Sequence, residues 1–227
     1  MTCLQNCGEF VLDTLYPPKC YFCGSILESG TLCQSCKAKL LVTDSDRRTQ
    51  YGTNFDRCIS YCFYTDQIKP AFHRYKFNGH YHYSRLFGQW MAEALTESGD
   101  GPFDLCTWVP LHRFRRWRRG YDQAELLARE VALLSGIPLV KTLEKTRNTA
   151  AQSGTERVAQ RYTNVQGVYR LARGASVTGQ RILLIDDVIT TGSTLENAAS
   201  ALRMGGAEEI VCLTLARSLH QAKAKAE

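Results

Sequence analysis

The 227-residue sequence lacks any apolar run that approaches the roughly 18 residues of a membrane-spanning helix. Its opening stretch, MTCLQNCGEFVLD, carries acidic side chains and no basic region, so the charge pattern of a secretory signal is absent. Internal repeats and low-complexity tracts are absent too. These absences exclude a membrane-spanning or repeat protein, and we expect a soluble globular protein of the cytoplasm.

Cysteine, in contrast, is plentiful, with 10 residues in the chain. A chain of this length with 44% hydrophobic residues can bury a core without disulfide staples, so reduced thiols are expected. Four of the cysteines form two CxxC pairs within KCYFCGSILESGTLCQSCK, residues 19–37. The segment 25–32 between the pairs is expected to form a short hairpin.

The two CxxC pairs have the spacing of a tetrahedral metal site. Two disulfides or four unliganded core thiols are the alternatives, but one zinc ion accounts for every position at once. Because four thiolates would close the coordination shell, we expect a structural zinc rather than a catalytic one. The predicted ligands are Cys20, Cys23, Cys33 and Cys36.

Strand-like and helix-like segments alternate after the cysteine pairs, which predicts an α/β fold with a parallel sheet covered by helices. We expect strands at 58–64, 104–110, 164–171, 181–186 and 209–216, and helices at 68–77, 83–95, 122–134 and 195–204. Asp122 is expected to cap its helix, with Glu125 as its capping partner. The predicted organisation is an N-terminal segment with a zinc ribbon (1–45), a linker (46–54), the main domain (55–220) and a frayed tail (221–227).

The segment RILLIDDVITTGSTL, residues 181–195, has the order expected of a phosphate site. ILLI is typical of a central parallel strand buried on both faces, and a helix follows it. The loop 190–194 should therefore lie at the carboxyl edge of the sheet, where the first N–H groups of the helix favour an anion. The GxxxxGK[ST] pattern of nucleoside-triphosphate P-loops is missing. A phosphate held by Thr190, Thr191, Gly192, Ser193 and Thr194 is predicted.

Two carboxylates, Asp186 and Asp187, precede this loop. Carboxylates are acceptors, so they suit sugar hydroxyls or a divalent cation shared with those hydroxyls rather than the phosphate itself. A phosphorylated ribose satisfies both demands.

A second candidate site is LHRFRRWRRGY, residues 111–121, where five arginines are interleaved with aromatic residues. This composition suits single-stranded nucleic acid, because guanidinium groups pair with phosphates and aromatic faces stack on bases. It also suits pyrophosphate, and a solvated basic loop with its aromatics packed underneath is the third interpretation. The nucleic-acid candidates are Arg115, Arg116, Trp117, Arg118 and Arg119, of which Arg118 and Arg119 are the first choices for anion contact.

IDDVITTGST resembles the phosphoribosyl pyrophosphate (PRPP) motif of type I phosphoribosyltransferases. With VPLHRFRRWRRGYDQAELLA, with Gln152, Arg157, Arg161 and Asn164, and with the cysteine pairs, the chain resembles the ComF/GntX family over nearly its whole length. That family combines a zinc ribbon with a type I phosphoribosyltransferase-like domain. The resemblance implies that the acids contact ribose, that the 190–194 loop holds the 5′-phosphate, and that Pro110 and Leu111 lie in the pyrophosphate loop.

The resemblance also implies a function. It predicts Mg²⁺-dependent PRPP binding and a role in handling incoming single-stranded DNA during natural competence, with a DNA-translocating helicase as partner. Purine-salvage relatives have an aspartate at the position of Thr190, so this chain departs from them. An active phosphoribosyltransferase on an unidentified acceptor and a ligand-responsive adaptor or regulator remain the alternatives. Because no residue can be named as a general base, the sequence favours binding over turnover.

Overall fold

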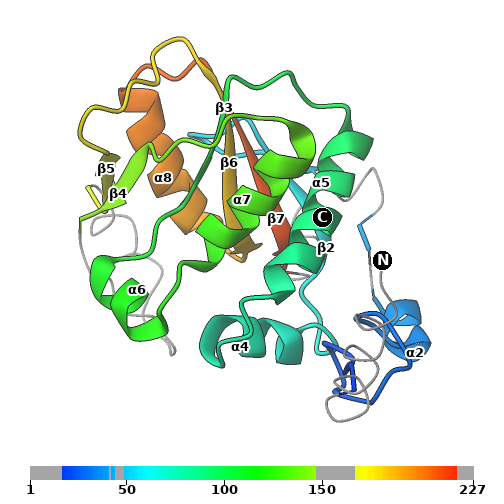
Figure 1. Ribbon diagram of the computed structural model, residues 1–227. Helices are drawn as coiled ribbons and strands as arrows, with labels where there is room; N and C mark the ends of the chain where they lie inside the picture. The colour runs from blue at the N-terminus through cyan, green and yellow to red at the C-terminus, as the bar shows by residue number, and fades with distance from the viewer. Residues whose placement is uncertain (1–16, 41, 44–48, 147–166, 219–227) are drawn as a thin grey trace, which may run out of the picture.

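The computed structural model describes residues 17–40, 42–43, 49–146 and 167–218. Its centre is a mostly parallel sheet, in which β2 (Arg57–Phe63), β7 (Glu209–Arg217), β6 (Arg181–Ile189) and β3 (Leu105–Trp108) lie side by side in that order (Figure 1). The two-residue β1 (Thr49–Gln50) adds an antiparallel edge next to β2. The predicted α/β fold with a parallel sheet is confirmed.

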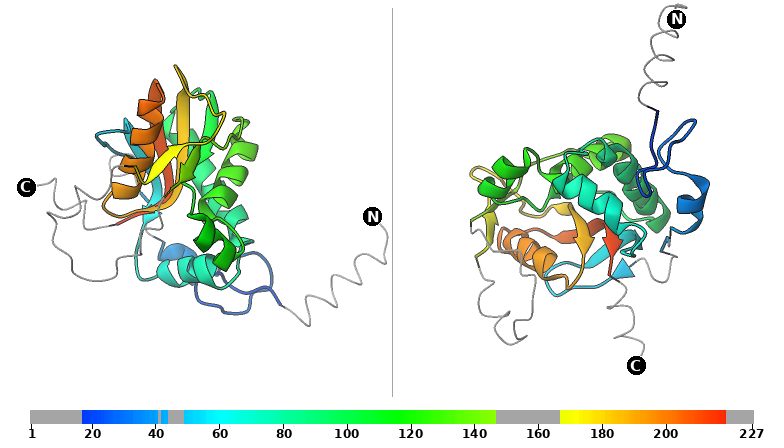
Figure 2. Two further views of the ribbon diagram at one scale, coloured as in Figure 1. Left: turned by 90° about the vertical axis from the view of Figure 1, so that its left-hand side faces the viewer. Right: turned by 90° about the horizontal axis from the view of Figure 1, so that it is seen from below.

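Helices cover both faces of this sheet (Figures 1 and 2). One face carries α4 (Lys69–Phe77), α5 (Tyr83–Ser98) and α7 (Gln123–Ser135), and the other carries α8 (Ser193–Met204). The hairpin of β4 (Leu143–Lys145) and β5 (Tyr169–Leu171) packs beside α8. The remaining helices are α6 (Arg113–Arg119), between β3 and α7, and α2 (Gln34–Ala38), in the cysteine-rich segment.

The core explains why β6 is apolar without alternation. Leu183 and Ile185 pack in the cluster of α4, α5 and α7, whereas Ile182 and Leu184 pack in the cluster of α8. Successive side chains of a strand point to opposite faces, so a strand that is buried on both faces must be apolar at each position. The run ILLI was the basis for the predicted central strand, and the structure bears that prediction out.

The cysteine-rich segment, residues 17–40, packs against α4 and α5 (Figure 2, right). Phe22 is buried and its ring meets Trp90 of α5 edge to face, with centroids 6.2 Å apart. Arg74 of α4 donates to the backbone carbonyls of Tyr21 and Phe22. This segment is therefore held against α4 and α5 by the burial of Phe22 and by the hydrogen bonds from Arg74.

Several local predictions differ from the structure. Segment 25–32 forms no hairpin of its own, because Ile26 pairs with Lys19 instead. The arginine-rich segment, for which a solvated loop is one of the three interpretations, forms the helix α6. β1 falls within the range 46–54, for which a linker is predicted; the domain boundaries themselves stay predictions.

Part of the predicted strand 164–171 lies outside the described residues, as do Gln152, Arg157, Arg161, Asn164 and the tail 221–227. Across the residues that are described, no helix has the length and apolarity needed to cross a membrane.

Candidate functional site

Asp186 and Asp187 lie in the part of β6 that extends beyond the end of its pairing with β3. β6 pairs with β3 only as far as Ile185, which lies opposite Trp108, but it pairs with β7 through Ile189. The edge of β6 beyond Ile185 is thus open on the β3 side. The chain that leaves β3 begins the turn 109–112 here, and the loop 190–194 leaves β6 at the same sheet edge. Because α7 and α8 cover opposite faces, this is the switch point at which parallel α/β sheets bind ligands.

Asp187 lies on the face covered by α4. Its Oδ2 is 2.7 Å from Nζ of Lys76, and both side chains are more than three quarters buried. Burial works to lower the pKa of Lys76, but the Asp187 carboxylate outweighs it and the pKa lies above its usual value. A lysine ammonium therefore already neutralises one of the two predicted ribose-binding acids.

Asp186 lies on the other side of the strand, toward β4 and β5. Burial and the neighbouring Asp187 carboxylate raise the pKa of Asp186 to about 8. Burial lowers the pKa of Lys145, and Asp186 opposes this shift. Burial raises the pKa of Tyr169, and Asp186 adds to this shift. The two acids thus face different surroundings, although one ligand lying across the end of β6 can meet both.

The loop after β6 has the backbone of an anion site. Gly192 has φ of 79°, in the left-handed region that favours glycine, and α8 begins at the next residue. The first N–H groups of a helix have no acceptor within it. Thr191 and Ser193 share a hydroxyl contact of 2.9 Å, and the loop encloses a hollow of about 20 Å³. All five residues of the predicted phosphate loop, Thr190, Thr191, Gly192, Ser193 and Thr194, line this hollow.

The turn that contains Pro110 and Leu111 is held beside the end of β6 by two hydrogen bonds. Val109 N–H donates to the carbonyl of Ile185 at 2.9 Å, and Leu111 N–H donates to Oδ2 of Asp122 at 2.7 Å. The predicted pyrophosphate turn and the phosphate loop therefore lie at the same sheet edge.

Asp122 caps α7 as predicted, since its side chain accepts from Glu125 N–H. The side chain of Glu125 does not return the bond, because it pairs with Arg116 at 3.1 Å and with Arg129 at 2.7 Å. Burial is the largest influence on Asp122 and raises the pKa of its carboxyl to about 6.

The pKa of Asp122 predicts a pH dependence of stability. The carboxyl has a pKa of about 6 when folded and an ordinary value of 3.8, so the folded state holds its proton more tightly. The free energy of unfolding should therefore fall as the pH rises from about 4 to about 6, by up to roughly 3 kcal/mol, and this contribution should then level off. Urea unfolding of the wild type and of Asp122→Asn at pH 4 and pH 7 measures it. Parallel pH profiles for the two proteins would contradict the assignment.

The five arginines of α6 differ in their surroundings. Arg116 pairs with Glu125, and Arg119 donates to Gln123 at 2.9 Å while its guanidinium lies 4.6 Å from the ring centre of Phe77. Burial lowers the pKa of Arg119 and the Asp187 carboxylate opposes that shift, which indicates that Arg119 lies near Asp187. Arg118 is exposed and makes no ion pair within the described part of the chain.

The aromatic side chains of α6 point to solvent. Trp117 is 80% exposed and Phe114 is 53% exposed, so the interpretation in which these rings are packed beneath a basic loop is wrong. Arg115 is half-buried and acts on the pKa of Lys145, which places it on the Asp186 side of the site.

Two lysines that no sequence pattern indicated lie near Asp186 and Asp187. Lys76 comes from the end of α4 and Lys145 from β4, more than 30 residues from Asp187 along the chain in each case. Parallel topology brings the segment after β2 to the same edge as the segment after β6. That rule predicts where α4 starts, but not which residue at its end turns toward the acids.

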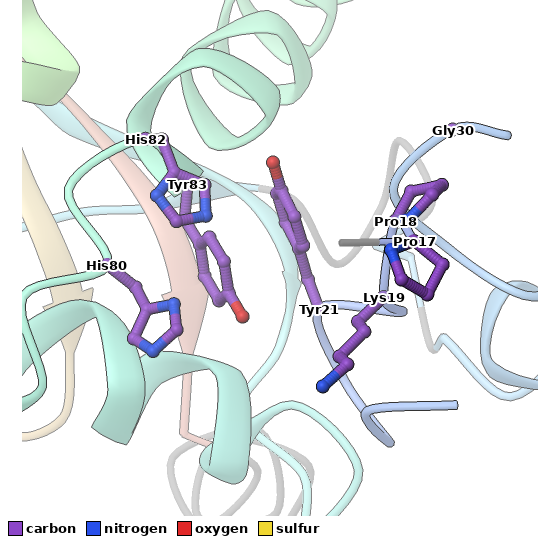
Figure 3. A pocket seen from close by; sticks show the side chains of 8 residues that line it. All are labelled: Pro17, Pro18, Lys19, Tyr21, Gly30, His80, His82 and Tyr83. Carbon is purple, nitrogen blue, oxygen red and sulfur yellow. The ribbon is translucent and has the colours of Figure 1, made fainter. Parts of the chain in front are cut away.

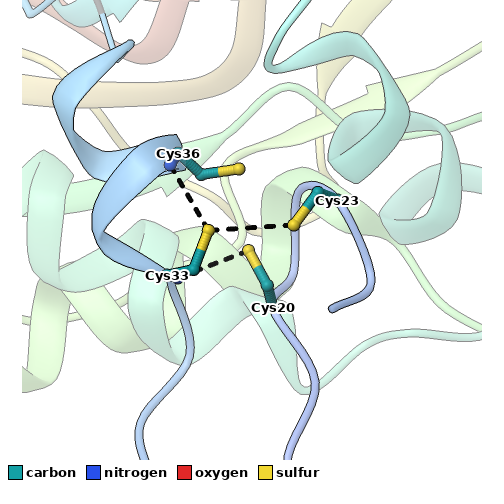
Figure 4. A group of neighbouring side chains, drawn as sticks. All are labelled: Cys20, Cys23, Cys33 and Cys36. Atoms are coloured by element: carbon teal, nitrogen blue, oxygen red, sulfur yellow. Dashed lines mark hydrogen bonds between the residues drawn. The ribbon is translucent and has the colours of Figure 1, made fainter. Parts of the chain in front are cut away.

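The four predicted metal ligands converge on one point (Figure 4). The Sγ atoms of Cys20, Cys23, Cys33 and Cys36 all lie within 4.8 Å of one another, and those of Cys23 and Cys33 are 3.8 Å apart. A tetrahedral zinc ion with Zn–S bonds of about 2.3 Å requires sulfurs separated by about 3.8 Å. The donor set therefore fits zinc. The remaining described cysteines, Cys58, Cys62, Cys106 and Cys212, are buried in the core.

Comparison with known proteins agrees with both parts of the chain. Residues 118–227 match the family described as phosphoribosyl transferase domain, and residues 11–63 match the double zinc ribbon domain. Competence protein F of Haemophilus influenzae is 29% identical over 209 residues, covering 88% of this chain and 85% of that protein. The DNA utilization protein YhgH of Escherichia coli K12 is 30% identical over 198 residues, covering 83% and 85%.

Competence protein ComFC of Streptococcus pneumoniae is 24% identical over 230 residues, covering 88% of this chain and all of that protein. Each of these three relatives covers more than four fifths of this chain. The chain therefore belongs to the ComF family, with a zinc ribbon followed by a domain of the type I phosphoribosyltransferase fold.

Proposed function

We propose that this protein binds PRPP with Mg²⁺ at the carboxyl edge of its sheet and uses the adjoining basic surface of α6 to handle single-stranded DNA during natural competence. The observation that carries the proposal is the loop 190–194, which leads into the N-terminus of α8 and is separated from Asp186 and Asp187 only by Val188 and Ile189. The match to the phosphoribosyl transferase domain supports the proposed PRPP binding. The names of the relatives support the proposed DNA handling.

The 5′-phosphate would occupy the loop 190–194. Gly192 lets the backbone approach the anion closely, and the positive end of the α8 dipole favours its charge. The hydroxyls of Thr191 and Ser193, which now contact one another, would turn to phosphate oxygens instead. Thr190 and Thr194 would supply further donors from the two ends of the loop.

The ribose hydroxyls would lie across the end of β6, within reach of Asp186 and Asp187. Oxygen donors of this kind are the ligands that Mg²⁺ prefers, and the cation would supply the positive charge that a pyrophosphate group needs. Lys76 already balances the charge of Asp187. We therefore expect Lys76 to keep Asp187 ionised and oriented while the ligand binds.

The pyrophosphate would lie between the turn at Pro110 and Leu111 and the arginines of α6. Arg119 is the better placed of the two first choices, since it lies near Asp187 and is held by its hydrogen bond to Gln123. Arg118 is exposed and would meet the pyrophosphate from the outer side of α6. Both guanidinium groups can form the bidentate hydrogen bonds that phosphate oxygens accept.

Single-stranded DNA would bind on the outer surface of α6. Arg115, Arg116, Arg118 and Arg119 supply positive charge, and the exposed ring of Trp117 offers a stacking platform for a base. A competence helicase is the proposed partner, in line with the relatives named for competence. Because the two anionic ligands share Arg118 and Arg119, they should compete.

Fluorescence anisotropy with a labelled oligonucleotide tests this proposal. Saturating PRPP should weaken DNA binding, and Arg118→Ala with Arg119→Ala should make the plot of log affinity against log salt shallower by roughly 0.7 per lost phosphate contact. Trp117→Ala should lower affinity about fivefold or more with an almost unchanged salt slope, because it removes stacking rather than charge.

The control is Arg170→Ala with Arg173→Ala, which removes the same charge from β5 and the turn after it. If DNA binds equally well with PRPP present and after both α6 replacements, the shared surface is disproved. Release of pyrophosphate in the presence of an acceptor would instead support the transferase alternative.

A further inference from the structure

A groove of about 440 Å³ lies where the zinc ribbon meets the turn before α5 (Figure 3). Lys19 and Tyr21 line it from the ribbon, and His80, His82 and Tyr83 line it from the other side. Its volume is within the range of ligand pockets, about 300–1,000 Å³. Neither the phosphoribose site nor the cysteine cluster uses these residues.

Aromatic rings form the floor of the groove. Tyr21 and Tyr83 are stacked, with centroids 3.8 Å apart and planes 12° from parallel. His82 meets both rings edge to face, at 5.4 Å from Tyr21 and 4.9 Å from Tyr83. In Figure 3, Tyr21 lies between Tyr83 on one side and Pro17 and Pro18 on the other. Such flat apolar surfaces suit a planar aromatic ligand.

The stack is held in place from behind. Arg74 donates from Nε to the hydroxyl of Tyr83 at 3.3 Å, and from its guanidinium to the carbonyls of Tyr21 and Phe22. Because one side chain of α4 fixes both partners, the rings are ordered before any ligand arrives. An ordered platform loses little conformational entropy on binding.

The groove is connected to the α6 surface by further rings. Tyr81 is 61% exposed and lies 6.2 Å from His82 on one side and 6.3 Å from Tyr121 on the other, measured between centroids. Tyr121 directly follows α6 and its C-cap Gly120. A series of aromatic side chains therefore runs from the end of α6 to the ribbon.

The charge of the groove is positive. Lys19 is exposed and its ammonium lies beside Tyr21 in Figure 3, and none of the described residues that line the groove is acidic. Aromatic faces next to a cation, without carboxylates, match a nucleobase and its phosphate. A duplex keeps its bases stacked on each other, so only an unpaired strand can place a base on Tyr21.

We propose that this groove binds a base of single-stranded DNA, and that Tyr81 and Tyr121 guide the strand there from α6. The inference rests on the proposed DNA-handling function and extends its site from α6 to the zinc ribbon. Lys19 contacts a backbone phosphate, and Tyr21 and His82 contact the base. The ribbon thus takes part in binding directly, beyond its structural role.

The test compares labelled oligothymidylates of about 6 and about 20 nucleotides, because only the longer strand can occupy α6 and the groove together. Lys19→Glu with His82→Ala should weaken binding of the longer strand about tenfold and leave the shorter strand unaffected, as should Tyr81→Ala. The matched controls are Lys37→Glu on α2 and Tyr51→Ala, both exposed and outside the groove.

Ultraviolet crosslinking of a bromodeoxyuridine oligonucleotide to the unmodified protein gives a second readout that needs no variant. Crosslinked peptides should contain Tyr21, Tyr81 or His82 in addition to α6. If the wild type binds DNA but the groove variants behave as their controls and crosslinks are confined to 113–119, the groove is not part of the DNA site. If the wild type binds no single-stranded DNA at all, the proposed function itself is wrong, which is a distinguishable result.

Discussion

Replacing Asp186 and Asp187 together by asparagine is expected to abolish Mg²⁺-dependent PRPP binding while the protein stays folded. Each carboxylate would lose a charged hydrogen bond to the ribose or its share of the cation. Such bonds are worth about 1.5–3 kcal/mol each, so affinity should fall a hundredfold or more. Titration calorimetry with PRPP in Mg²⁺ buffer measures the loss, and circular dichroism checks the fold.

The control for this pair is Asp66→Asn. Asp66 is an exposed carboxylate in the turn after β2, where it pairs with Lys69 at the same edge of the sheet. Its replacement removes one negative charge without touching the loop 190–194, and PRPP affinity should not change. Wild-type affinity in the double variant would remove both acids from the site.

Removing zinc is expected to unfold the ribbon and to lower the melting temperature of the rest of the chain. Metal binding and folding are coupled in such segments, with a binding free energy on the order of 10 kcal/mol. Loss of the ribbon uncovers Trp90 and leaves Arg74 without its carbonyl acceptors. Burial of one large apolar side chain contributes about 1.5–3 kcal/mol, so a fall of roughly 5 °C should follow.

Metal analysis and thermal unfolding measure both effects. Purified protein should hold one zinc per chain, and Cys20→Ser with Cys23→Ser should lose it. Cys106→Ala is the control, because Cys106 is buried in β3 away from the cluster and should leave the zinc content unchanged. A folded, reduced sample without zinc, or full zinc in the double serine variant, would refute the assignment.

The sheet and the acid pair were predictable from the sequence because they depend on local patterns. A short run of apolar residues without alternation is typical of a strand buried on both faces, and residues 182–185 are such a run. The polar loop that follows must then leave the carboxyl edge. The cysteine cluster was predictable for the same kind of reason, since two CxxC pairs define a ligand set by spacing alone.

The contacts between distant elements were not predictable. The ion pair of Lys76 with Asp187 depends on the rotation of α4 over the sheet, which no local pattern encodes. The stack of Tyr21 on Tyr83 depends in the same way on how the ribbon docks. In each case, the side chains that meet are far apart in the chain.

α6 was predictable in part. Gly120 has φ of 80° and ends the helix, which is the role that glycine commonly has after a helix C-terminus. At the other end, Nδ1 of His112 accepts from Phe114 N–H, and histidine is not among the residues preferred for that role. A helix packed with like charges is also unfavourable by itself, so the pairing of Arg116 with Glu125 helps to stabilise it.

Calorimetric titration of PRPP into the wild type and into Gly192→Val tests the central claim most directly. The wild type should bind one PRPP per chain in Mg²⁺ and far more weakly in metal-free buffer. Gly192→Val should not bind, because the added side chain occupies the approach of the phosphate. Gly174→Val, at another glycine with positive φ and open surroundings, has the same kind of backbone strain and should bind as the wild type does. No saturable binding in the wild type, or equal affinity in Gly192→Val, would contradict the account.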